Sequence, residues 1–137
     1  MLIEKAKTRV LVVDNERMIA DTLVIILTQN GYEATVAYSG EEAVQKALVF
    51  RPHIVLSDII MGAMNGLEAA MLIAHADPGC KILLSSGQPA TAELLLQAKS
   101  NGRFFEVMPK PVHPTVILEQ INSLVAADLS PQNLQKL

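Results

Sequence analysis

Short apolar runs alternate with longer amphipathic stretches along most of the chain, a pattern that predicts parallel strands joined by crossover helices. Five runs have the length and content of strands, at about Arg9–Val13, Glu33–Ala37, His53–Ser57, Lys81–Ser85 and Phe104–Met108. Each is followed by a stretch that predicts a helix, at about Glu16–Gln29, Gly40–Phe50, Gly66–Ala76, Pro89–Asn101 and Pro114–Ala127. The chain should therefore form five strand-then-helix repeats.

Local signals support these boundaries. Ser39 can accept a backbone hydrogen bond as the N-cap of the second helix, and Asn30-Gly31 ends the first. The apolar stripes that we expect to face the sheet are Ile19, Leu23 and Ile26 in the first helix, Ala43, Val44, Ala47 and Leu48 in the second, and Ile117, Ile121 and Leu124 in the last. Right-handed crossovers then place helices on both faces of the sheet, which predicts an α/β three-layer sandwich.

The composition fits one compact domain. The chain has 137 residues, 50% of them hydrophobic, which suits one sizeable core. A net charge of −3 and an aromatic content of 4% argue against direct nucleic-acid binding. We expect no membrane segment and a cytoplasmic location, because no apolar run reaches the roughly 18 residues that span a bilayer and no signal peptide is evident. Cys80 is the only cysteine, so it forms no intramolecular disulfide and should pack beside a strand.

Charged residues stand at the ends of three predicted strands. Asp14 follows the first strand, Asp58 the third and Lys110 the fifth, while Ser85-Ser86 ends the fourth. All strand carboxyl ends meet at one edge of a parallel sheet, where such sheets bind their ligands. A carboxylate attacks phosphorus only when the charge of the donor is neutralised, which a divalent cation and a lysine achieve. The pattern therefore predicts metal-assisted phosphoryl transfer.

With these motifs in this order and spacing, the chain from about Thr8 to Ala127 resembles the receiver domains of bacterial two-component response regulators. The resemblance implies a flavodoxin-like fold, with a five-stranded parallel sheet of order 2-1-3-4-5 and five helices. It implies that Asp58 accepts the phosphoryl group, and that Lys110 and Ser86 contact it. The implied Mg²⁺ ligands are the side chains of Asp14, Asn15 and Asp58 and the backbone carbonyl of Ile60.

The sequence departs from the family's pattern at four places. The second acidic position after the first strand is Asn15, so one negative charge is missing and weaker Mg²⁺ binding is expected. Val107 replaces an aromatic switch residue three positions before the lysine. Met61-Gly62 stands where Met-Pro is frequent. Either Ser85 or Ser86 supplies the hydroxyl group, and we prefer Ser86 because a glycine follows it.

We expect a signalling domain rather than an enzyme. It would take a phosphoryl group from a sensor histidine kinase or a histidine phosphotransfer protein onto Asp58. Its output would pass to a downstream protein through helix 4, strand 5 and helix 5. Residues 1–127 would form the receiver domain, and residues 128–137 a tail that is a short helix or disordered.

Three alternatives stay open to different degrees. A phosphate-independent pseudo-receiver, acting only as an interaction module, is favoured by Asn15 and Val107. An enzyme of the haloacid-dehalogenase type also uses a strand-end aspartate with Mg²⁺, but it normally has a second aspartate two residues later, where this chain has Ile60. A flavin carrier with the same sheet would need a hydroxyl- and glycine-rich loop, and Asp14–Arg17 has different chemistry.

Overall fold

The computed structural model describes residues 7–59, 66–86, 106–109 and 113–128. The strands are β1 (Arg9–Val13), β2 (Glu33–Ala37), β3 (Ile54–Asp58), β4 (Lys81–Ser86) and β5 (Glu106–Pro109). The helices of the described part are α1 (Arg17–Gln29), α2 (Gly40–Phe50), α3 (Gly66–Ala76) and α5 (Pro114–Asp128). The helix predicted at about Pro89–Asn101 and the tail beyond Asp128 lie outside the described residues.

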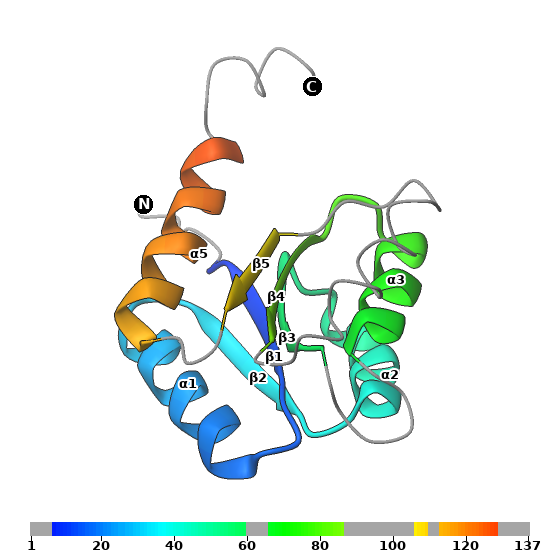
Figure 1. The fold of residues 1–137 in the computed structure, drawn as a ribbon. Helices are drawn as coiled ribbons and strands as arrows, with labels where there is room; N and C mark the ends of the chain where they lie inside the picture. The colour runs from blue at the N-terminus through cyan, green and yellow to red at the C-terminus, as the bar shows by residue number, and fades with distance from the viewer. Residues whose placement is uncertain (1–6, 60–65, 87–105, 110–112, 129–137) are drawn as a thin grey trace.

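The strands are all parallel and lie in the order β2-β1-β3-β4-β5, which confirms the predicted sheet. Figure 1 shows α1 and α5 on one face of this sheet and α2 and α3 on the other. The chain is therefore a three-layer α/β sandwich with the flavodoxin-like strand order. Within the described part, no helix is both long and apolar enough to cross a membrane.

The core consists of two apolar layers, one on each face of the sheet. Val10 and Val12 of β1 pack in the layer under α1 and α5, while Leu11 and Val13 pack in the layer under α2 and α3. This alternation follows from the strand geometry, in which successive side chains point to opposite faces. A central parallel strand is buried on both faces, which explains why β1 is almost uniformly apolar.

The helix boundaries follow from local backbone chemistry. The N–H of Glu42 donates to Ser39 Oγ at 3.1 Å, so Ser39 caps α2 as predicted. After α1, Gly31 has a φ of 91°, a left-handed conformation that glycine adopts without a Cβ clash. Arg51 closes α2 at a φ of 51°, and its carbonyl oxygen accepts two hydrogen bonds from the guanidinium of Arg9. These contacts fix the entry of the chain into β3.

The rotation of two helices differs from the prediction. Ile19 is 40% exposed, and α1 instead buries Ala20, Leu23 and Leu27. Leu48 of α2 is 67% exposed, although the periodicity placed it in the buried stripe. Both helices carry apolar residues on adjacent stripes, so the helical period alone does not determine which stripe meets the sheet.

Cys80 provides a test of the packing under α2 and α3, where it belongs to the same buried cluster as Val55 and Ile73. Burial raises the pKa of the Cys80 thiol to about 12, with a smaller contribution from the nearby Asp77 charge. At mildly alkaline pH its thiolate fraction should be about a thousandfold below that of an unfolded cysteine. Reaction with a disulfide reagent, measured with and without denaturing urea, should therefore be far slower in the native protein. Equal rates in the two states would contradict the buried position of Cys80.

Candidate functional site

The carboxyl ends of β1 and β3 place two acidic residues next to each other. Val13 pairs with Ser57 across these strands. Asp14 and Asp58 are the residues that follow this pair, one on each strand path. Neighbouring strands lie about 4.8 Å apart. β3 begins and ends one residue later than predicted, and Asp58 is its last residue, paired with Ser85 of β4. The sheet register therefore fixes the backbone positions of both carboxylates.

Asp14, Asp58 and Ser85 line one cavity of about 600 Å³ at this edge of the sheet. Asp14 is only 5% exposed and Asp58 only 9% exposed. The helical walls of the cavity come from α1 and the first turn of α5, through Glu16, Met18, Ile19, Thr22, Leu23, Pro114 and Ile117. Most of the described residues that line this cavity are apolar, and charge interactions are stronger next to apolar groups than in water.

Asp14 is held by hydrogen bonds at its backbone and at its side chain. Its N–H donates to the carbonyl oxygen of Ala37 in β2 at 3.1 Å. Its Oδ1 accepts from the N–H of Glu16 at 2.9 Å, which closes a turn two residues long. Glu16 is the N-cap residue of α1, but its side chain makes no capping hydrogen bond. The carboxylate of Asp14 therefore takes over part of the role of an N-cap.

The backbone of Asp58 is in close contact with the start of α3. The N–H of Gly66 donates to the carbonyl oxygen of Ile59 at 2.6 Å. The N–H of Ile59 donates to the carbonyl oxygen of Ser85 at 3.0 Å. A Cβ on Gly66 would press against the carbonyl oxygen of Asp58 and lie 2.6 Å from Ser57 Oγ. Glycine is therefore required here, and α3 packs tightly behind the Asp58 backbone.

The structure describes only some of the other predicted site residues. Ser86 ends β4 and pairs with Pro109 of β5, so the residue after Pro109, Lys110, follows a strand that is next to Ser86. Lys110 and Ile60 themselves lie outside the described residues. Asn15 is exposed, and among the described residues that line the cavity Glu16 is present but Asn15 is not. The roles of these residues stay predictions.

The described donor groups fit a magnesium ion better than a transition metal. In the described ranges, no cluster of three or more His, Cys, Asp or Glu side chains could hold a metal ion. Mg²⁺ does not need such a cluster, because it is commonly bound by one or two carboxylates together with waters and phosphate oxygens. Asp14 and Asp58 supply two carboxylates on adjacent strands, which is the protein contribution expected for such a site.

Comparison with known proteins identifies the class to which this fold and site belong. Residues 10–122 match the profile of the response regulator receiver domain. The chain is 37% identical over 117 residues to the chemotaxis protein CheY of Thermotoga maritima, a match that covers 85% of this chain and 96% of that protein. The protein therefore belongs to the response regulator receiver domain family. Other curated relatives are DNA-binding response regulators, of which the chain spans about half the length.

Solved structures give the same assignment. A CheY-like response regulator receiver domain protein from Methanospirillum hungatei superposes with a TM-score of 0.80 at 26% identity, over 89% of this chain and 96% of that chain. The CheX–CheY–BeF₃–Mg²⁺ complex from Borrelia burgdorferi superposes with a TM-score of 0.73 at 26% identity, over 86% of this chain and 89% of that chain. The chain is similar to both in fold and over nearly its full length.

The sequence did not indicate two parts of this region. The apolar wall of the cavity includes Ile19, which the predicted stripe had placed against the sheet. Tyr38 contacts α1 and α2 directly beside the Asp14 loop, yet its sequence neighbours gave no sign of this role. The one available signal was the spacing of Arg17 and Asp21, which places two polar groups on one face of α1.

Gly66→Ala should destabilise the protein, because the added methyl group has to displace the backbone of Asp58. Overpacking of this kind costs roughly 1–3 kcal/mol of unfolding free energy. Urea unfolding followed by circular dichroism would measure it. Gly79→Ala is the matched control, because its Cβ would meet only Asp77 Oδ1 at 3.6 Å, an ordinary contact. Equal stabilities of the two variants would show that α3 does not press on Asp58.

Proposed function

We propose that this receiver accepts a phosphoryl group on Asp58, from a sensor histidine kinase or a histidine phosphotransfer protein, in the presence of Mg²⁺. The observation that carries the proposal is the register of β1 and β3, which puts Asp14 and Asp58 side by side in one cavity. Family membership supports it, and so does the similar CheY of Borrelia burgdorferi, whose complex contains BeF₃ and Mg²⁺.

The chemistry is a displacement at phosphorus. A carboxylate oxygen of Asp58 attacks the phosphorus of a phosphohistidine, and the P–N bond breaks as the new O–P bond forms. The imidazole leaves with the electron pair of the broken bond and takes up a proton. Bound Mg²⁺, held by Asp14, Asp58 and the Ile60 carbonyl, would supply positive charge to the phosphoryl oxygens. Ser86 and Lys110 would contact the phosphoryl group from the ends of β4 and β5.

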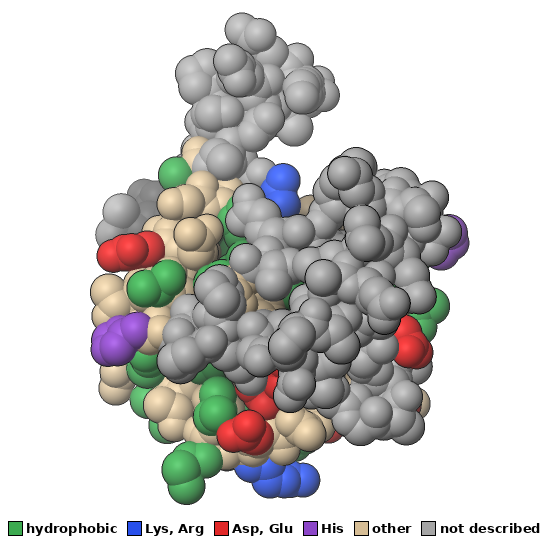
Figure 2. All heavy atoms as spheres, viewed as in Figure 1, with side chains coloured by type: hydrophobic (Ala, Val, Ile, Leu, Met, Phe, Trp, Pro, Cys, Tyr) green, Lys and Arg blue, Asp and Glu red, His purple; other side chains and the backbone are tan. Residues whose placement is uncertain are grey.

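The surface beside the cavity supports docking of a protein donor. Met18 is 83% exposed and Ile25 is 57% exposed, and both belong to α1, as does the partly exposed Ile19. Figure 2 shows exposed hydrophobic side chains over the α1 region, at the lower left, with acidic side chains nearby. An apolar surface next to the acceptor can pack against a partner protein while the phosphohistidine of that partner enters the cavity. Output through helix 4, β5 and α5 is the family's usual route, and we extend it to this chain.

A phosphate-independent pseudo-receiver is the second candidate. The specific observation in its favour is Asn15, which removes a carboxylate from the loop after β1 and is exposed. Such a module would keep the fold and the docking surface but would not be labelled by a phosphoryl donor. The next experiment separates the two functions.

Incubation with acetyl phosphate or phosphoramidate and Mg²⁺ should add one phosphoryl group to the wild-type protein, detected by intact mass. Asp58→Ala should abolish the labelling, because no other carboxylate ends β3. Asp77→Ala is the matched control, since Asp77 lies in the turn before β4 and outside the cavity. Labelling of Asp58→Ala at the wild-type level would refute the assignment, and absence of labelling in the wild type would favour the pseudo-receiver.

Asn15→Asp should strengthen Mg²⁺ binding, because it restores a negative charge near the site. Two unit charges about 4 Å apart interact by roughly 4 kcal/mol at an effective dielectric of 20. Exposure of residue 15 screens most of this energy, so a roughly threefold to tenfold fall in Kd is expected. Calorimetric titration with Mg²⁺ measures it, and Gln45→Glu, an equal charge change on the exposed face of α2, is the control. Equal affinities of Asn15→Asp and wild type would show that residue 15 does not face the metal.

A further inference from the structure

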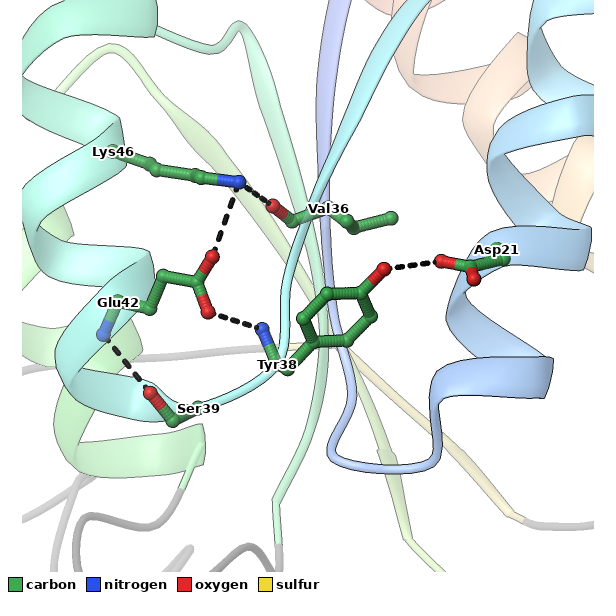
Figure 3. Close-up of polar contacts among 6 residues, drawn as sticks. All are labelled: Asp21, Val36, Tyr38, Ser39, Glu42 and Lys46. Carbon is green, nitrogen blue, oxygen red and sulfur yellow. Dashed lines mark hydrogen bonds and ion pairs between the residues drawn. The ribbon is translucent and has the colours of Figure 1, made fainter.

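Tyr38 stands at the end of β2 and contacts both α1 and α2, as Figure 3 shows. It follows β2 directly and precedes Ser39, the N-cap of α2. Its hydroxyl group donates a hydrogen bond to Asp21 Oδ1 of α1 at 2.5 Å. The guanidinium carbon of Arg17, the first residue of α1, lies 4.1 Å from the centre of the Tyr38 ring. Tyr38 therefore contacts the first two turns of α1 through a charge-assisted hydrogen bond to Asp21 and a cation–π contact with Arg17.

The backbone of Tyr38 is fixed from the opposite side by α2. Its N–H donates to Glu42 Oε2 at 3.0 Å, while the N–H of Glu42 donates to Ser39 Oγ. Lys46 forms an ion pair with Glu42 Oε1 at 3.1 Å and also donates to the carbonyl oxygen of Val36. The hydrogen bond from Tyr38 lowers the pKa of Glu42, so this carboxylate stays ionised and accepting at neutral pH. The backbone of Tyr38 is thus fixed by its contact with α2.

The same short segment also fixes the other end of the Asp14 loop. The carbonyl oxygen of Ala37, the residue before Tyr38, accepts the hydrogen bond from the N–H of Asp14. Only Asp14, Asn15 and Glu16 separate β1 from α1. Ala37 therefore holds the beginning of this loop and Tyr38 holds the helix at its end. A shift of α1 relative to β2 would have to move the carboxylate of Asp14, because the loop is too short to absorb it.

We propose that Tyr38 is a positioning residue for the Mg²⁺ site, which acts by fixing α1 and hence the Asp14–Glu16 loop. The proposal rests on the function proposed above for Asp14. Tyr38 does not line the cavity among the described residues, so it acts through the loop rather than on the ligand. Its loss should weaken metal binding without removing any metal ligand.

Tyr38→Phe removes only the hydroxyl group and its bond to Asp21. Loss of one such hydrogen bond corresponds to a roughly threefold to tenfold rise in the Mg²⁺ Kd, measured by calorimetry. Exchange of the Glu16 amide, followed by NMR in metal-free protein, should accelerate by a similar factor. Asp21→Ala should reproduce both effects, whereas Asp21→Asn keeps an accepting oxygen and should restore most of the wild-type behaviour.

Tyr32→Phe is the matched control for a purely structural effect. Tyr32 lies just before the other end of β2, and its hydroxyl group donates to Asn122 of α5, far from the Asp14 loop. This variant should lose stability in urea at least as much as Tyr38→Phe, because Tyr32 is more buried. Its Mg²⁺ affinity and Glu16 exchange should equal those of the wild type.

The outcomes are distinct. If Tyr38→Phe and Tyr32→Phe change Mg²⁺ affinity equally, or if neither does, Tyr38 has no positioning role and the proposal is overturned. If the wild-type protein binds no Mg²⁺, the proposed function fails, while the exchange of the Glu16 amide still decides whether Tyr38 holds the loop. Faster exchange with unchanged affinity would show that the loop moves but that its position does not govern the metal.

Discussion

The site depends on one constraint, which is the parallel register between β1 and β3. Because Val13 lies opposite Ser57, the next residue along each of these two neighbouring strands carries a carboxylate. Both strands are buried on both faces, so they cannot slip by one residue without moving their apolar side chains to the wrong layer. The core that stabilises the sheet therefore also fixes where the backbone leaves β1 at Asp14 and where β3 ends at Asp58.

Burial of these carboxylates has an energetic consequence. A buried charge costs free energy unless hydrogen bonds or opposite charge compensate for it. The structure compensates Asp14 in part through the N–H of Glu16, which gives the carboxylate a local structural role as well. A bound cation would stabilise both carboxylates further, so ligand binding and stabilisation of this edge of the sheet would act in the same direction.

α1 contributes to the site in three ways. Its apolar residues Met18, Ile19 and Leu23 form one wall of the cavity, and its exposed apolar residues form the surface that we propose for docking of a phosphoryl donor. Its position is set at one end by the three-residue loop from β1 and at the side by Tyr38 (Figure 3). A partner that docks on α1 would therefore press on the same helix that orients Asp14. Under the proposals made above, partner recognition and metal geometry would share this helix.

The sequence by itself determined the order of the elements, their three layers and the position of both aspartates at strand ends. These features follow from local patterns, such as the apolar run before Asp14 and the cap at Ser39, and from the handedness of parallel crossovers. The strand order was implied by the resemblance to receiver domains. Tertiary structure decided which stripe of α1 faces the sheet, so that Ile19 is partly exposed and lines the cavity. It also decided the contacts of Tyr38 with Arg17 and Asp21, because residues that are distant in sequence meet only when the helices pack. Periodicity repeats within one element, whereas helix rotation and contacts between elements depend on the shape of the neighbouring surface.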